Sequence, residues 1–201
     1  MSQRDVAPPF RSLAGPEATA KRLGFAAERQ LATPDGALAA AIWRFQHKSS
    51  YELRRHADRS TNVIAIPISG WHHHTYFGDG HLKWSGPHPA FHLNIVVAGE
   101  QPHGLFRSDR PFTYLHVYVR QAMVEQLATA SGALTAGRTV TLVDPMCAHD
   151  PFVESVCRQI LREMTCGDKV SRVMLEALGR QLVGGLLRRH SNLAVAPRGV
   201  V

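Results

Sequence analysis

Residues 71–118 read WHHHTYFGDGHLKWSGPHPAFHLNIVVAGEQPHGLFRSDRPFTYLHVY, a succession of short aromatic and β-branched runs separated by Gly and Pro. Runs of this length between turn residues are typical of antiparallel strands. The GDG at residues 78–80 stands between residues 76–77 and 82–84, which predicts a β-hairpin. Most of the twelve histidines fall within this stretch. We therefore expect a β-rich body that also holds any chemistry of the protein.

Two further segments extend the predicted β-structure. Residues 36–48 read GALAAAIWRFQHK, and their large apolar side chains are Ile42, Trp43 and Phe45. This segment predicts a strand that ends near Lys48. Residues 62–69, NVIAIPIS, are β-branched, and Pro67 places this strand at a sheet edge or at a bulge.

The strand at residues 114–119, YLHVYV, alternates strictly. Its period of two places on one face Tyr114, His116 and Tyr118. The opposite face holds Leu115, Val117 and Val119. The aliphatic face is the better candidate for burial, whereas a ligand cavity requires the barrel interior to lie on the other face. The sequence does not decide between the two.

The hydrophobic period changes after Arg120. Residues 121–131 predict a short helix ended by a glycine. Asp150-Pro151 is an N-cap followed by a first-turn proline, so a longer helix is expected up to Gly167. Asp168 begins a second long helix that ends in the cations of residues 188–190. Because the connection at Gly167 and Asp168 is so short, the two helices are expected to run antiparallel.

The chain is therefore expected to have an α+β fold in three parts. Residues 1–30 contain several prolines and few large apolar side chains and predict a loose leader that is able to fold back on the body. Residues 31–149 form the β-rich body with the short helix, and residues 150–192 form the antiparallel helical hairpin. A chain of 201 residues with 44% hydrophobic residues can bury one substantial core.

Composition disfavours several classes of protein. The net charge is +7, but the cations are scattered, which favours a solvated surface over a nucleic-acid track. No run of about 18 apolar residues occurs, so we expect no membrane contact and a soluble, cytoplasmic protein. The cysteines, Cys147, Cys157 and Cys166, include no CxxC pair and predict reduced, packed thiols.

The order of elements and the amino-acid sequences of several segments resemble the N-terminal regulatory half of AraC/XylS-type bacterial transcription regulators. The segments are VIAIPISG (63–70), FHLNIVVAGEQPHG (91–104), LHVYV (115–119), DPFVESVCRQILREM (150–164) and MLEALGRQLVGGLLRRH (174–190). The resemblance covers residues 25–190. It implies a cupin-like β-barrel of jelly-roll type that binds a small-molecule effector, followed by a helical hairpin through which two copies form a homodimer.

The expected dimerisation surface is the apolar stripe of the second long helix: Val170, Met174, Leu178, Leu182 and Leu186. The family continues after the hairpin into about a hundred residues with two helix-turn-helix motifs, so contact with DNA is expected only through a half that this sequence does not contain. The sequence does not separate a piece of a longer regulator from a protein that keeps only sensing and pairing. The hairpin itself is a poor helix-turn-helix because its helices are long and apolar along one face.

Aromatic and polar side chains on these strands predict a cavity for a small ligand. The effector-binding candidates are Trp71, His72, His74, Tyr76, Trp84, His92, Asn94, Tyr114, His116 and Tyr118. Taken singly, His116 and each of the tyrosines fit the role of a satisfied core or surface residue at least as well as that of a ligand contact.

His72 and His74 lie at i and i+2 on one strand face, which can begin a metal site. A cupin metal site reads HxH, then Glu about four residues later, then a distant His, whereas the next Glu here is Glu100. His116 or His103 would have to complete such a site. We therefore expect no metal or other cofactor, and keep His72, His74 and His116 as the ligands if a metal binds.

No nucleophile stands beside a base at a catalytic spacing, and the paired glycines form no phosphate loop. The sequence thus favours a non-enzymatic module that senses an effector and pairs with a second copy. A metal-dependent cupin enzyme with a histidine-lined site is the alternative, and a structural partner protein without a ligand is the third possibility.

Overall fold

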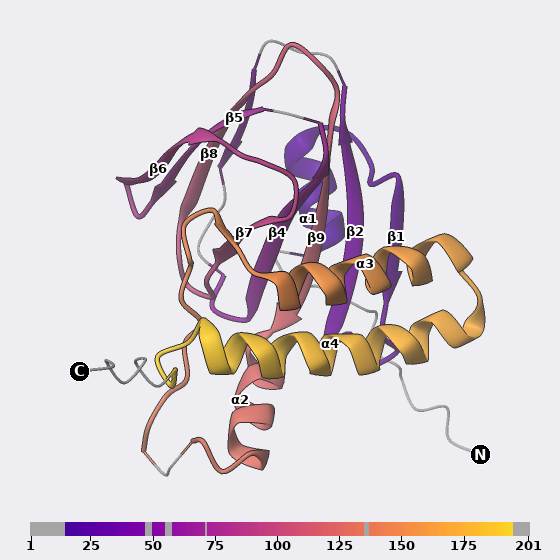
Figure 1. The fold of residues 1–201 in the computed structure, drawn as a ribbon, viewed down its shortest axis with the longest axis vertical. Coiled ribbons are helices and arrows are strands. Elements are labelled where there is room, and N and C mark those ends of the chain that lie inside the picture. Colours follow the sequence, from indigo (N-terminus) through magenta and orange to yellow (C-terminus); the bar gives the residue numbers. More distant parts are fainter. Residues whose placement is uncertain (1–14, 47–49, 55–57, 71, 135–136, 195–201) are drawn as a thin grey trace.

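The computed structural model describes residues 15–46, 50–54, 58–70, 72–134 and 137–194. Two antiparallel sheets face each other, and a helical hairpin covers the outer side of the larger one (Figure 1). The larger sheet has the order β1 (Arg29–Ala32), β2 (Leu38–Phe45), β9 (Phe112–Arg120), β4 (Thr61–Ser69), β7 (His92–Val96) and β10 (Ala148–His149). The smaller sheet has the order β3 (Tyr51–Arg54), β8 (Pro102–Arg107), β5 (His73–Gly78) and β6 (His81–Pro87). The predicted α+β fold, a cupin-like jelly roll followed by a helical hairpin, is confirmed, although the sheets do not close into a barrel over the described residues.

The β5–β6 hairpin follows from local turn chemistry. Asp79 has φ 50° and Gly80 has φ 79°, the two positive values that a type I′ turn requires. Beyond the turn, Phe77 lies opposite Leu82, but the next pair is Tyr76 with Trp84. This bulge shifts the pairing of the rest of the hairpin by one residue.

Strand β4 is not at an edge of its sheet, so the first of the two placements predicted for Pro67 is wrong. β4 lies between β9 and β7, and its register with β9 shifts between Pro67 and Ser69. The irregularity accommodates a residue that has no N–H to give to the ladder. The bulge predicted as the alternative is therefore confirmed.

Strand β9 has both faces buried. Tyr114 and Tyr118 belong to the aromatic core between the sheets, together with Trp43, Phe45 and Phe112. The other face of β9 packs into a second core, which the larger sheet shares with the helices. The prediction that the aliphatic face is buried is confirmed, and the histidine-bearing face is buried as well because the smaller sheet covers it.

Residues 16–23 form helix α1 (Pro16–Leu23), so the predicted loose leader is wrong for this segment; residues 1–14 lie outside the described part of the chain. Thr19 is buried, and its Oγ1 accepts a hydrogen bond of 3.0 Å from the Tyr118 hydroxyl. This contact fixes α1 against the aromatic core.

The predicted helices after β9 are confirmed as α2 (Gln121–Ala130), α3 (Pro151–Cys166) and α4 (Lys169–Arg189). Asp150 caps α3 by accepting from two backbone amides, Asp168 caps α4, and Gly167 between them has φ 64°. Helices α3 and α4 run antiparallel across the larger sheet (Figure 1). None of the described helices is both long and apolar enough to cross a membrane.

The apolar stripe of α4 is divided between the core and the surface. Leu178, Leu182 and Leu186 are at most 4% exposed and pack inside this chain. Val170 and Met174 are 63% and 40% exposed. The stripe predicted for dimerisation is therefore corrected: three of its five residues serve the fold of the single chain. The prediction of packed thiols is likewise wrong for the exposed cysteine at the end of α3.

Candidate functional site

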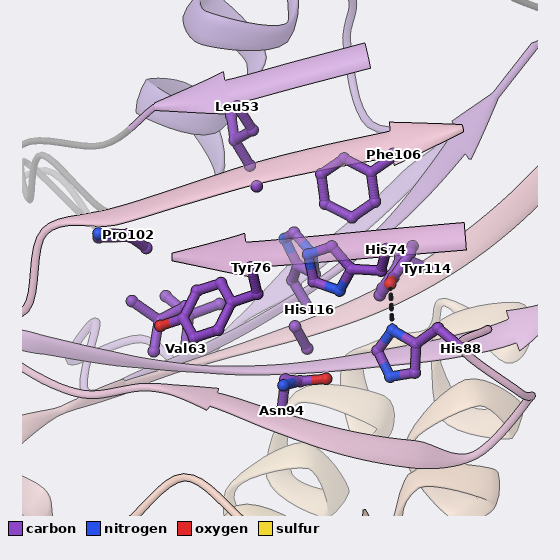
Figure 2. A pocket seen from close by; sticks show the side chains of 13 residues that line it. Leu53, Val63, His74, Tyr76, His88, Asn94, Pro102, Phe106, Tyr114 and His116 are labelled. Carbon is purple, nitrogen blue, oxygen red and sulfur yellow. Dashed lines mark hydrogen bonds between the residues drawn. The ribbon is translucent and has the colours of Figure 1, made fainter. Parts of the chain in front are cut away.

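A small cavity lies between the two sheets (Figure 2). Its water-accessible volume is about 40 Å³, which gives room for about three water molecules. Both sheets contribute to its lining, which consists of Leu53, Val63, Ala65, His74, Tyr76, His88, Asn94, Val96, Pro102, Gly104, Phe106, Tyr114 and His116. No charged Asp, Glu, Lys or Arg side chain is among these described residues, so the lining is uncharged, and most of its surface is apolar.

The structure brings part of the predicted effector-binding set to this cavity. The predicted residues that line it are His74, Tyr76, Asn94, Tyr114 and His116. His72 is buried beside His74, and Tyr118 is buried on the neighbouring part of β9.

Three predicted residues leave the candidate set or cannot be placed. Trp84 on β6 is half-buried and does not line the cavity. His92 also lies outside it, with its ring 5.5 Å from that of His149. Trp71 lies outside the described residues.

Three histidines form a cluster at the cavity. One ring nitrogen from each of His72, His74 and His88 lies within 4.8 Å of the other two. His72 and His88 are 0% exposed, and His74 is 5% exposed. His72 precedes β5, His74 lies on its inward face, and His88 directly follows β6. The β5–β6 hairpin therefore supplies all three imidazoles.

The Tyr114 hydroxyl joins two of these imidazoles. Its oxygen is 2.8 Å from His72 Nε2 and 2.7 Å from His88 Nδ1 (Figure 2 shows the second contact). His88 Nε2 is 3.2 Å from the backbone carbonyl of His92, which only accepts, so Nε2 carries the proton of a neutral ring. His88 Nδ1 then accepts from the Tyr114 hydroxyl, and the Tyr114 oxygen accepts from His72 Nε2.

His74 stands outside this chain of hydrogen bonds. Both of its ring nitrogens are buried without a hydrogen-bond partner among the described residues, and so is His72 Nδ1. An unpaired buried polar atom costs about 1–3 kcal/mol, and native proteins contain few of them. The arrangement of unpaired nitrogens therefore indicates a place for a ligand or for ordered water.

Burial keeps the cluster neutral. Burial, together with the neighbouring histidines, lowers the pKa of His72 to about 3. Burial lowers the pKa of His88 to about 4, although its hydrogen bond to the His92 carbonyl acts in the opposite direction. Burial and the neighbouring histidines also hold the pKa of His74 well below its usual value. Burial also raises the pKa of the Tyr114 hydroxyl well above its usual value, so Tyr114 keeps its proton. At neutral pH the site therefore presents neutral imidazoles and a protonated phenol.

Phenylalanine rings hold two of the imidazoles in place. The His74 ring stacks on Phe106 with centroids 4.4 Å apart, and the His72 ring stacks on Phe112 at 4.5 Å. Gly104 makes room for this arrangement, because a Cβ there would lie 3.2 Å from His74 Nε2. The rings are thus fixed by apolar packing before any ligand binds.

Three neutral, buried imidazoles fit a divalent transition-metal ion, which binds deprotonated nitrogen. The predicted ligand set is corrected, since His88 takes the place of His116. His116 Nδ1 instead lies 3.3 Å from the Tyr118 hydroxyl, and His103 Nε2 lies 3.0 Å from Glu52. Within the described chain no carboxylate belongs to the cluster, which separates it from the HxH-Glu-His pattern.

His88 was missed because of the one-residue bulge in the hairpin. The pairing of Phe77 with Leu82, continued without a bulge, would place Pro87 opposite His72. The shift instead brings His88 there, and its backbone N–H donates to the carbonyl of His72 at 3.0 Å. The available sequence signal was a histidine on each arm of a predicted hairpin, and this signal does not specify which residues face each other.

No protein-family model and no curated protein sequence matches this chain. Several solved structures, one of them a cupin domain, resemble part of it. A putative ethanolamine utilization protein Q from Salmonella typhimurium is 14% identical over 45% of this chain and 65% of its own, with a TM-score of 0.31. The cupin domain of an XRE-family transcriptional regulator from Enterobacter cloacae is 18% identical over 41% of this chain and 81% of its own, with a TM-score of 0.32.

The DMSP lyase DddQ from Ruegeria pomeroyi is 19% identical over 41% of this chain, with a TM-score of 0.33. This chain spans only 38% of that enzyme's length. Identities and TM-scores this low do not indicate a shared activity, ligand or family.

Proposed function

We propose that the chain is the effector-sensing and dimerisation domain of a cytoplasmic transcription regulator of AraC/XylS type. The observation that carries this proposal is the position of β9 between the cavity and the helical hairpin. Tyr114 and His116 line the cavity from one face of β9, while Leu115 and Val117 pack on the other face in the core shared with α3 and α4. A ligand that shifts side chains in the cavity therefore acts on the strand against which the hairpin packs.

A second connection follows the edge of the larger sheet. His88 donates to the carbonyl of His92 on β7, and His92 lies opposite His149 on β10. The next residue, Asp150, caps α3, and its carboxylate also lies 2.9 Å from the ring of His190 at the end of α4. Ligand binding at His88 thus has a route to both helices of the hairpin, through the hydrogen bond to His92, the pairing of β7 with β10 and the contacts of Asp150.

Hydrogen exchange tests whether the cavity and the hairpin are coupled. Ala65 lines the cavity from β4, and Ala65→Val fills part of it. In this variant of the 201-residue chain, we expect the hydrogen-exchange rates of backbone amides in α3 and α4 to change. The rates are compared at amides that exchange through local opening rather than through global unfolding. The matched control is Thr75→Val, a residue that does not line the cavity and whose hydroxyl lies 3.1 Å from that of Ser85. Exchange changes confined to β4 and its neighbouring strands would refute the coupling.

Pairing of two copies is part of the proposal, but through a smaller surface than the sequence predicts. The first turns of α4 expose Val170, Val173 and Met174, and the first two of these are 63% and 68% exposed. Exposed apolar side chains grouped on one helix are typical of an interface. A dimer would therefore use the beginning of α4 rather than its buried second half.

The histidine cluster favours a second candidate function, a metal-dependent cupin enzyme. An enzyme needs room for a substrate beside its metal, and the cavity of about 40 Å³ offers room for only about three water molecules. A sensor requires coupling between the cavity and α3 and α4, whereas an enzyme does not, so helices that fail to respond in the hydrogen-exchange experiment would favour the enzyme.

A further inference from the structure

The size of the cavity limits what the proposed sensor can bind. A water-accessible volume of about 40 Å³ admits an ion with one or two waters, but no sugar or aromatic effector unless several side chains move. Two of the lining side chains stack on each other, His74 on Phe106 at 4.4 Å, and Phe106 in turn stacks on Phe45 at 5.8 Å. The described site is therefore matched to a very small ligand.

The unpaired nitrogens indicate which small ligand. Among the described residues, neither ring nitrogen of His74 has a hydrogen-bond partner, and neither does His72 Nδ1. Histidines that bind metal ions usually donate their other ring N–H to a carbonyl or carboxylate, which orients the free nitrogen. His88 has this arrangement already, because Nε2 donates to the carbonyl of His92 and Nδ1 faces the cluster.

The donor set also selects the kind of ion. Within the described cluster, nitrogen is the donor atom and no carboxylate takes part. Imidazole suits zinc, nickel, cobalt, copper and ferrous iron, whereas magnesium and calcium prefer oxygen ligands. Tetrahedral coordination at about 2.05 Å separates nitrogens by about 3.3 Å, so the ligand atoms, now within 4.8 Å, must close up modestly.

We propose that His72, His74 and His88 together bind one divalent transition-metal ion, and that this ion is the effector of the sensor. The second half of the statement rests on the sensing function proposed above. The Tyr114 hydroxyl, 2.7 Å from His88 Nδ1, occupies the space beside that nitrogen and either turns away or becomes a fourth ligand when the ion enters. Filling the site would thereby move Tyr114, a residue of β9.

The test uses the untagged, EDTA-treated full chain titrated with Zn²⁺ and with Co²⁺. We expect one ion per chain by calorimetry, a visible absorption of tetrahedral Co²⁺, and a rise in Tm of about 5–10 °C at a hundredfold excess of Zn²⁺ over its Kd. Mg²⁺ and Ca²⁺ at the same concentrations should leave Tm unchanged. Absence of any one-to-one binding by Zn²⁺ and Co²⁺ would overturn the proposal.

Substitutions locate the site. His74→Gln and His88→Gln should weaken Zn²⁺ binding by about 100-fold or more, because each removes a ligand. His73→Gln is the matched control, since His73 lies between His72 and His74 in the sequence but does not belong to the cluster. Equal binding by His73→Gln and His74→Gln would assign the ion to surface histidines and overturn the proposal. The Co²⁺ spectrum of the unsubstituted chain remains decisive if the His74 or His88 variants fail to fold.

Hydrogen exchange with and without Zn²⁺ separates the site from its function. Binding that depends on the three histidines and changes exchange in α3 and α4 supports both halves of the proposal. Binding that leaves both helices unchanged retains the metal site but overturns its role as effector. Failure to bind, combined with helices that respond to Ala65→Val, overturns the metal site and leaves the proposed sensing function standing.

Discussion

Lowering the pH from 7.5 to 5.0 should destabilise the metal-free protein through its buried imidazoles. Burial holds the pKa of His72 at about 3 and the pKa of His88 at about 4 in the folded chain, against about 6.5 in the unfolded chain. Between these values only the unfolded chain takes up protons, so stability is lost as the pH falls below 6.5. Proton linkage gives about 2 kcal/mol for each of these two residues at pH 5.0, and His74 acts in the same direction.

Urea unfolding in EDTA at the two pH values measures this loss. Burial raises the pKa of Asp144 and of Glu100, which acts in the opposite direction, so the wild type alone does not isolate the histidines. In His72→Gln the loss between pH 7.5 and 5.0 should be smaller than in the wild type by about 2 kcal/mol. His81→Gln, an exposed position on the same hairpin, should behave as the wild type. Equal losses in all three proteins would refute a neutral, buried His72.

Three further predictions concern the helical hairpin. Gly185→Ala places a Cβ against the ring of Phe152 and should lower the free energy of unfolding by about 1–3 kcal/mol. Gly184→Ala meets no described atom within 4 Å and should leave the stability unchanged or raise it by up to about 1 kcal/mol. Similar Tm values for the two variants would contradict this packing. Asp150→Ala removes the cap of α3 and should cost about 1–2 kcal/mol in urea unfolding, so a change within error would count against the cap. Leu182→Asp should abolish the folded circular dichroism spectrum, while Val173→Asp should stay folded and elute as a monomer; a dimer would exclude the exposed face of α4 from pairing.

The elements that the sequence predicted well are those specified by neighbouring residues. Asp150 and Asp168 cap the long helices, Gly167 ends the first of them, and Asp79-Gly80 turns the hairpin. Each of these depends on hydrogen bonds and φ values within a few residues. They could therefore be read without knowing what packs around them.

What the sequence did not predict depends on layers that come from distant parts of the chain. Alternation on β9 separates two faces, but it does not tell that a second sheet covers one and two helices cover the other. The stripe on α4 gives one apolar face, and only the packing shows that Leu178 and Leu182 are used inside the chain while Val170 stays exposed. Periodicity marks the residues to be buried and leaves their partner unspecified.

The histidine cluster shows the same limit at the scale of one residue. His72 and His74 were recognised because they stand at i and i+2 on one face of a predicted strand. His88 joins them only through the bulge beside Tyr76, and a bulge leaves no reliable mark in a single sequence.

Strand β9 has no side exposed to solvent, and this should constrain how the protein evolves. A change at Tyr114 or His116 that suits a new ligand alters the path of the strand, and no flexible outer surface can absorb that alteration. We expect such changes to be inherited together with changes at Leu115, Val117 or the facing helix residues. Among descendants of this chain, ligand preference and hairpin packing should therefore diverge as one trait.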